Sequence, residues 1–400
     1  MQDKFQFHVG YYDDLHPVPA VNFQMNRWIN YLGESAVEEL RAIAPKLTDF
    51  SSYRREFLAL AEKALAEGRK LHAAYYFRSA EFFMWRDDPA KLPTRQKFLE
   101  LVLEYYGVKA SDTYAIPYPD GDVRADLFAY RFTPDQPKDT LVLFGGGDSY
   151  IEEFLPVLLA LRDRGYDIVC FEGPGQGHVL EESGLPMTPD WHKPVKAVLD
   201  YFGLSGVTLI GISMGGCLVI RAAAFEPRVS RVIAYDVLYD MGAMRRGKVN
   251  PLVRAVMGAV FALKAAPLYN RMVQHAMAEN PQADWAVRQG MHIHGVKTPF
   301  EYARKNAAYR TAEVSHLLRQ DVLLMAGTED FAIPLEHFYR QIEALKNVRS
   351  LTARMFTRAE QAQAHCQVGN LGLAVNVIVD WIESRRGNSA EVRANVEVTA

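Results

Sequence analysis

The spacing of apolar residues along the chain changes near residue 111. Before it, apolar and aromatic residues recur at helical spacing, which predicts helices at 23–32, 35–43, 53–66, 70–85 and 92–106. After it, short apolar runs alternate with amphipathic stretches, and we expect strands at 113–119, 123–131, 140–144, 167–171, 207–210, 229–235, 322–326 and 350–356. This alternation predicts an α/β fold with a mostly parallel sheet and helices on both of its faces.

The alternation is interrupted between residues 237 and 318, where methionine, aromatic and basic residues dominate. Apolar residues return to helical spacing at 252–263, 268–278 and 299–307, so we interpret this segment as an inserted helical lid. The expected division of the chain has four parts: a helical N-terminal cap domain (1–110), the first part of the α/β core (111–236), the lid (237–318) and the second part of the core (319–400).

The strongest chemical signal lies at 207–225. A β-branched apolar run leads into Gly-x-Ser-x-Gly at 211–215, and an Ala-rich helical stretch follows. A strand, a tight turn and a helix in this order are the context in which the pattern forms a nucleophile elbow. Ser213 is therefore the expected nucleophile. A serine hydroxyl is inert by itself, so the site also needs a histidine base and a carboxylate that orients it.

The base and the acid are sought beyond the carboxyl ends of the strands, where catalytic groups of open parallel sheets gather. His365 lies in the loop between the last strand and the last helix, and we expect it to be the base. His337 lies in the middle of a helix, where a structural role is expected. Asp330 follows the strand 322–326, and we favour it over the adjacent Glu329 as the acid.

Two further acids and an oxyanion hole complete the expected site. Asp236 and Asp240 follow the strand after the elbow, and either could reach the histidine, face the substrate or cap a helix. The oxyanion needs two backbone N–H groups. Met214, next to the nucleophile, should donate one, and Gly146 or Gly147 the other, because small residues allow close backbone approach. The sequence does not choose between the two glycines.

Composition narrows the possible partners of this chain of 400 residues. Its net charge of −3 argues against nucleic acid, and the absence of a long apolar run or a leader argues against membrane insertion and secretion. The three cysteines lack metal-ligand spacing, and His292 and His294 have no third ligand nearby in sequence. Gly-Pro-Gly-Gln-Gly at 173–177 lacks the ending of a phosphate loop and is interpreted as a tight connection. We therefore expect a cytoplasmic protein without metal or cofactor.

Several motifs occur together in this chain and carry a resemblance that spans nearly its whole length. They lie at 146–149, 171–177, 189–191, 211–216 and 364–367, with further similarity at 22–28 and 285–309. The set resembles the α/β-hydrolases that include bacterial 2,6-dihydroxypseudooxynicotine hydrolase and the fungal polyketide-shortening hydrolases of pigment pathways.

The resemblance implies a helical N-terminal domain that caps the core and, in many members, a homodimer. It also implies a triad formed by Ser213, Asp330 and His365 and the hydrolysis of a carbon–carbon bond beside a ketone. Some members add a lid carboxylate near the substrate, but this sequence does not identify its counterpart.

The leading functional hypothesis is a serine hydrolase that cleaves a C–C bond next to a ketone in an aromatic or polyketide-like small molecule. The second hypothesis is hydrolysis of an ester, lactone or thioester by the same triad. The third is acyl transfer or cyclisation of a biosynthetic intermediate. A fourth hypothesis is that the chain is a hydrolase-like scaffold used only for binding. Aromatic residues of the predicted cap would suit a flat apolar substrate or simply pack its helices: Trp28, Tyr75, Tyr76, Phe77, Phe82, Phe83 and Trp85.

Overall fold

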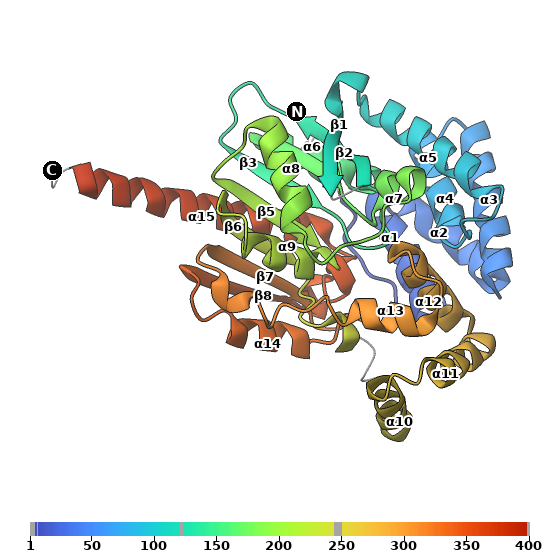
Figure 1. The fold of residues 1–400 in the computed structure, drawn as a ribbon. Coiled ribbons are helices and arrows are strands. Elements are labelled where there is room, and N and C mark those ends of the chain that lie inside the picture. The colour runs from blue at the N-terminus through green and yellow to red at the C-terminus, as the bar shows by residue number, and fades with distance from the viewer. Residues whose placement is uncertain (1–4, 6, 121–122, 244–249, 398–400) are drawn as a thin grey trace.

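The computed structural model describes residues 5, 7–120, 123–243 and 250–397. The described residues form an eight-stranded sheet between layers of helices (Figure 1). Its strands lie in the order β1-β2-β4-β3-β5-β6-β7-β8. The edge strand β1 runs antiparallel to β2 and β2 antiparallel to β4, and all other neighbours are parallel. The predicted α/β fold is thereby confirmed. The bounds are β1 (Thr113–Asp120), β2 (Val123–Phe132), β3 (Asp139–Phe144), β4 (Tyr166–Glu172), β5 (Val207–Ile212), β6 (Val229–Tyr235), β7 (Asp321–Gly327) and β8 (Ser350–Phe356).

The central strands are mostly apolar and buried because both faces of the sheet are covered. Successive side chains enter different cores: Leu141 and Leu143 of β3 pack on one face, and Val142 and Phe144 on the other. The first core includes residues of α6 (Leu155–Asp163) and α15 (Leu371–Glu397). The second includes residues of α7 (Gly177–Ser183), α8 (His192–Phe202), α9 (Gly215–Ala223) and α14 (Glu336–Ala344).

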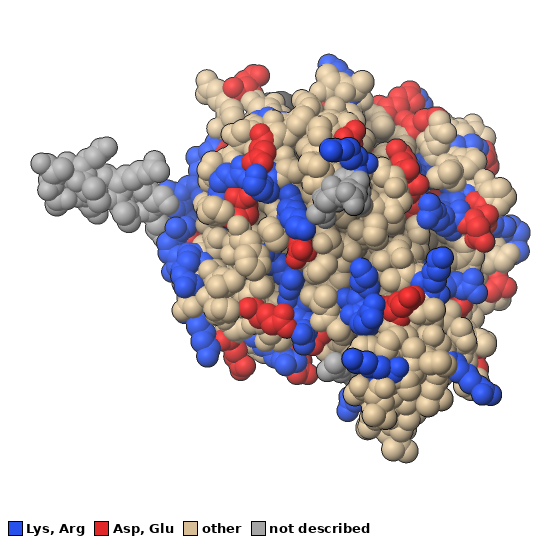
Figure 2. All heavy atoms as spheres, viewed as in Figure 1, with Lys and Arg blue, Asp and Glu red and all other residues tan. Residues whose placement is uncertain are grey.

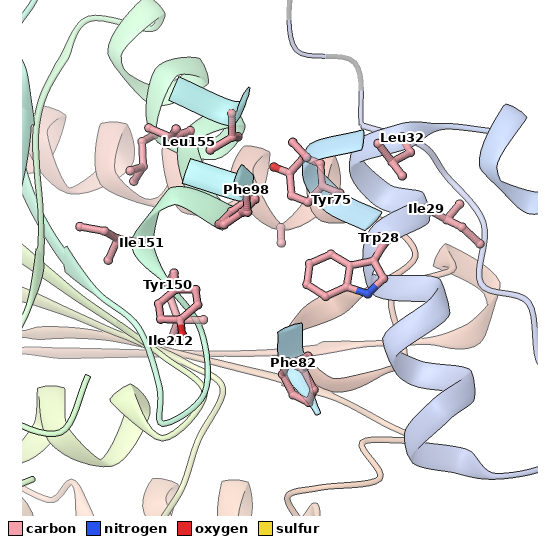
Figure 3. Packing of buried hydrophobic residues seen from close by; sticks show 14 of the residues in the cluster. Trp28, Ile29, Leu32, Tyr75, Phe82, Phe98, Tyr150, Ile151, Leu155 and Ile212 are labelled. Atoms are coloured by element: carbon pink, nitrogen blue, oxygen red, sulfur yellow. The ribbon is translucent and has the colours of Figure 1, made fainter. Parts of the chain in front are cut away.

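Five helices precede the sheet in the chain, where the sequence predicts five. They are α1 (Pro19–Leu32), α2 (Ser35–Ile43), α3 (Phe50–Ala66), α4 (Lys70–Phe82) and α5 (Lys91–Tyr106), and α4 packs against both α3 and α5. These helices share one hydrophobic cluster with the sheet and α6. Figure 3 shows Trp28, Tyr75 and Phe98 facing Tyr150 and Ile212 within this cluster. The N-terminal helices are therefore packed directly on the part of the chain that forms the sheet.

The described residues between β6 and β7 form four α-helices: α10 (Pro251–Ala262), α11 (Ala266–Glu279), α12 (Pro281–Ile293) and α13 (Pro299–Asn306). The sequence analysis predicts three of them and omits α12. Its N-terminus carries a signal that could have found it, because Asn280 caps the helix through the N–H groups of Gln282 and Ala283, and Pro281 occupies its first position. On the face shown in Figure 2, acidic and basic side chains are interspersed, and α10 projects at the bottom with few charges.

The described helices do not include one that is both long and apolar enough to cross a lipid bilayer. Large apolar side chains of α10 and α11 are nevertheless exposed, among them Leu252, Leu263 and Leu268. The homodimer that the resemblance implies stays a prediction.

Phe98 provides a test of how strongly the N-terminal helices depend on the shared core. Its side chain is fully buried in α5, so Phe98→Ala should lower the free energy of unfolding by about 3–5 kcal/mol, through lost burial and the cavity it leaves. Tyr105 of the same helix is 52% exposed, and Tyr105→Ala should change it by less than about 0.5 kcal/mol. Urea denaturation followed by tryptophan fluorescence measures both. Equal losses in the two variants would contradict the described packing.

Candidate active site

Ser213 lies in the sharp turn between β5 and α9. Its φ of 60° is in the left-handed region, which side chains rarely adopt. The turn closes only because its neighbours are glycines. A Cβ at Gly211 would lie 2.1 Å from the carbonyl oxygen of Gly215, and a Cβ at Gly216 would lie 1.6 Å from that of Asp236. Backbone strain and close packing therefore hold the Ser213 hydroxyl at the carboxyl edge of the sheet.

His365 lies in the loop that connects β8 to α15, and its imidazole contacts Ser213. The Nε2 atom is 2.9 Å from Ser213 Oγ, and Nδ1 is 2.7 Å from Asp330 Oδ2. With its proton on Nδ1, the ring donates to the carboxylate and accepts the serine hydroxyl at Nε2. His337, by contrast, is buried in α14, where its Nδ1 accepts the N–H of Tyr239.

Asp330 and Glu329 are adjacent in the turn after β7 but point to different surroundings. The Oδ1 atom of Asp330 accepts the N–H groups of Ala332 (2.7 Å) and Ile333 (2.9 Å), which leaves Oδ2 directed at the histidine. The carboxylate of Glu329 instead pairs with Arg358 on the surface. The structure thus brings the buried acid, and not its neighbour, into line with His365.

Asp236 adds a second carboxylate to the same imidazole. Its Oδ2 atom lies 3.0 Å from His365 Nδ1 and also accepts the N–H of Cys366 at 2.6 Å, while Oδ1 accepts the Gln367 amide at 2.9 Å. Asp240, the other acid that the sequence suggests, instead lies in an isolated β-bridge with Arg310. Of the two, the structure brings only Asp236 to the histidine.

Burial and charge act in opposite directions on the titration of this group. Burial by itself lowers the pKa of His365, but the charge of Asp330 and the hydrogen bonds of both aspartates outweigh it and hold that pKa well above its ordinary value. Burial raises the pKa of Asp330. For Asp236, burial is outweighed by hydrogen bonds from His365 and from the Cys366 N–H, so its pKa lies below its ordinary value. Protonated His365 is therefore a stabilised state of the site.

The described residues include one group with the composition of a metal site, formed by Asp236, His365 and Cys366, whose ligand atoms lie within 4.8 Å of one another. Burial raises the pKa of the Cys366 thiol to about 11, so the sulfur is protonated near neutral pH. The imidazole nitrogen of this group already donates to carboxylates. This donor set fits a proton-transfer site better than a metal site.

The turn after β3 passes close to the serine. A Cβ on Gly146 would lie 3.0 Å from Ser213 Cβ and 3.2 Å from its Oγ, whereas one on Gly147 would first meet Ile293 and Met214. Met214 is the N-cap residue of α9, so its own N–H has no acceptor within the helix. Backbone N–H groups from both segments are therefore available beside the hydroxyl.

Gln176 orients this turn, and the sequence analysis misses it because it interprets residues 173–177 only as a connection. The side chain is buried, and its Nε2 donates to the carbonyl oxygens of Gly145 (2.7 Å) and Gly146 (2.9 Å). In a trans peptide the C=O and N–H point in opposite directions, so the N–H groups of Gly146 and Gly147 are directed away from Gln176. The signal available in the sequence was a glutamine within a Gly-rich turn that follows a strand.

A cavity of about 640 Å³ opens beside Ser213 and His365. Its walls come from α1, α4, α12 and the loops after β3, β5 and β7, and most of its lining is apolar or aromatic. Of the aromatic residues that the sequence suggests for a substrate pocket, Phe82 and Phe83 line the cavity, whereas Trp28, Tyr75, Tyr76 and Phe77 are buried in the core. The aromatic lining includes Phe23, Tyr31, Phe50, Phe82, Phe83, Phe154, Tyr235, Trp285, Tyr302 and Phe331.

Comparisons with known proteins bear on the family and the fold of this chain. The sequence profile described as "Alpha/beta hydrolase family" matches residues 141–368. The hydrolyase poxO of Penicillium oxalicum is 28% identical over 388 residues, which cover 86% of this chain and 91% of poxO. The 20-hydroxy-prefusarin hydrolase FUS2 of Gibberella moniliformis is 31% identical over 276 residues, which cover 62% of this chain and 64% of FUS2.

Among solved structures, 2,6-dihydroxy-pseudo-oxynicotine hydrolase is similar with a TM-score of 0.55 and 20% identity, over 88% of this chain and 87% of that one. This similarity shows a common fold. The resemblance indicated by the motifs is thereby confirmed, and the match of the family profile to more than half of the chain identifies the family. The chain belongs to the alpha/beta hydrolase family.

Proposed function

We propose that the chain is a serine hydrolase that cleaves a carbon–carbon bond beside a ketone in an aromatic or polyketide-like small molecule. In this proposal Ser213 is the nucleophile, His365 the general base and Asp330 the acid that orients it. The observation that carries the proposal is the hydrogen-bonded line from Ser213 Oγ through His365 to Asp330, at the wall of a largely aromatic cavity. Helices α1 and α4 of the cap and α12 and α13 of the lid line that cavity.

The proposed reaction begins when His365 takes the proton of Ser213 and the Oγ attacks the ketone carbon. The resulting oxyanion accepts hydrogen bonds from the N–H of Met214 and from that of Gly146 or Gly147. As the carbon–carbon bond breaks, its electron pair moves to the leaving carbon, which takes the proton from His365 Nε2. A water molecule, deprotonated by His365, then attacks the acyl-serine, releases the carboxylic acid and restores Ser213.

Two features favour a carbon leaving group. A carbanion must be protonated as it leaves, and the carboxylates beside His365 stabilise the imidazolium that carries this proton. The cavity is large enough for a drug-sized molecule and its lining is mainly apolar, which suits an aromatic or polyketide-like ketone. The names of relatives support only the hydrolysis of a small molecule, since they read 20-hydroxy-prefusarin hydrolase and 2,6-dihydroxy-pseudo-oxynicotine hydrolase.

Replacement of the nucleophile tests the catalytic assignment. Ser213→Ala should lower kcat at least about 10³-fold, because no other group takes over the acyl transfer. It should also abolish covalent labelling by a fluorophosphonate probe. Ser230→Ala is the matched control, since Ser230 Oγ bonds the Gly206 carbonyl at the opposite edge of the sheet. Labelling that persists in Ser213→Ala would refute the assignment, and a binding scaffold would fail to label in the wild type.

A substrate comparison tests the bond that is cleaved. We expect hydrolysis of 1-phenyl-1,3-butanedione, with one water added to the two products, and slow turnover of short p-nitrophenyl esters. Mass spectrometry of the products and release of p-nitrophenol provide the measurements. Fast ester turnover with inert diketones would instead favour ester, lactone or thioester hydrolysis. A product that gains no water would identify acyl transfer or cyclisation.

The pH dependence of kcat/KM should show the effect of the two aspartates on the pKa of His365. The base must be neutral to act and its pKa is raised, so kcat/KM should increase with pH above about 6.5. Asp236→Asn removes one negative charge and should move this limb to lower pH, with moderate loss of rate. Asp330→Asn should lower kcat by about 10⁴, because it removes the acid that orients the imidazole.

Asp240→Asn is the matched control and should leave the pH profile in place, because Asp240 makes no contact with His365 among the described residues. An unchanged limb in Asp236→Asn would show that this carboxylate does not set the titration of the base.

A further inference from the structure

Helix α1 carries the motif at 22–28 that the resemblance includes and that the proposed reaction does not use. One side of the helix is hydrogen-bonded to the segment that precedes it and to the loop that follows His365. Asn22 and Asn26 accept the N–H groups of His16 (3.0 Å) and Tyr12 (2.7 Å). Asn30, one turn further, accepts the N–H of Gly369 (3.0 Å). These asparagines recur every four residues and so form one line along the helix, which fixes its orientation.

The other side of α1 faces the cavity. Phe23, Gln24, Arg27 and Tyr31 all contribute to its lining. The ring of Phe23 lies 5.9 Å from that of His365, so the cavity-facing side of α1 starts next to the catalytic histidine of the proposed reaction. Arg27 follows one helical turn later, about 6 Å along the axis. The asparagine line thereby positions a cationic side chain in the wall of the substrate cavity.

Arg27 belongs to a buried cluster of ion pairs. Its guanidinium pairs with Glu153, which is shared with Arg78 at 2.7 Å. Arg78 and Lys91 in turn pair with Glu81. These ion pairs link three cations to two carboxylates, and the buried carboxylate of Glu181 also interacts electrostatically with Lys91. Arg27 is the member that lines the cavity.

The surroundings of Arg27 favour an anionic ligand. The guanidinium lies over the rings of Trp28 (4.9 Å) and Phe82 (5.6 Å), and it also donates to Gln24 at 3.4 Å. These contacts leave further N–H groups of the guanidinium for a ligand. Among the described lining residues Arg27 is the one permanent cation, since burial lowers the pKa of His294 to about 4 and His365 must be neutral to act as the base. The carboxylate in that lining, Asp148, is exposed to solvent.

We propose that Arg27 binds an acidic oxygen group of the substrate, so that the preferred ligands are aromatic or polyketide-like ketones bearing a carboxylate, a phenolate or an enolate oxygen. The inference rests on the proposed function for the identity of the ketone, but the anion site itself does not depend on turnover. A planar guanidinium gives paired hydrogen bonds to such a group, and the apolar surroundings strengthen them.

A binding experiment with a matched pair of probes tests the proposal. Isothermal titration calorimetry of the full chain at pH 8 compares 2-naphthylacetate with the neutral 2-naphthylacetamide. The carboxylate should bind at least tenfold more tightly than the amide to the wild type, and Arg27→Met should bind both equally. Arg27→Lys keeps the positive charge but not the planar pair of donors, so it should retain a reduced preference for the carboxylate probe.

Arg288→Met is the control, because Arg288 pairs with Asp284 and lies over Trp85 outside this cavity. It should keep the full preference. Arg27→Met should remain folded, since Arg78 still pairs with Glu153, and a native circular dichroism spectrum with a cooperative thermal transition checks this.

Equal affinity of the two probes for the wild type, or no measurable binding of either, would overturn the proposal. So would a preference that persists in Arg27→Met. A chain that prefers the carboxylate but does not label at Ser213 would contradict the catalytic assignment alone, so the two failures are distinguishable.

Discussion

The structure depends on a buried imidazole that is held between a hydroxyl and two carboxylates. Burial of a polar ring is unfavourable unless its nitrogens are hydrogen-bonded, and His365 meets this condition on both sides. Its partners come from separate loops. Ser213, Asp236, Asp330 and His365 follow β5, β6, β7 and β8, which are consecutive neighbours in the sheet. Because these strands are parallel, their carboxyl ends share one edge, and the parallel sheet by itself brings the four groups together.

The second carboxylate changes what this histidine can do. With Asp330 alone the imidazole would be oriented, and with Asp236 as well its protonated state gains a further charge contact. Asp236 also bonds Cys366 N–H and the amide of Gln367, so the acid that contacts the ring fixes the loop that carries it. Orientation and proton affinity therefore have the same structural origin.

Residues distant from the chemistry serve the same site through the backbone. Gln176 holds the carbonyl groups of the turn after β3, and thereby directs its N–H groups. Helix α1 connects the N-terminal segment to the cavity, because one side of it bonds backbone groups and the other forms a wall. The charges of Arg78, Glu81 and Glu153 can be buried beneath this wall because each is paired.

The sequence by itself determined the sheet, the elbow and the order of Ser213, Asp330 and His365 as candidates, because strand periodicity and the Gly-x-Ser-x-Gly turn are local patterns. Local patterns favoured Asp330 over Glu329, but the directions in which these adjacent side chains point are fixed only by the folded backbone. Local patterns could not show that Asp236 reaches the histidine, that Gln176 holds the turn, or that Arg27 lines the cavity. Those contacts join residues that are far apart in the chain, and they were decided by the order of strands in the sheet and by the packing of helices on it.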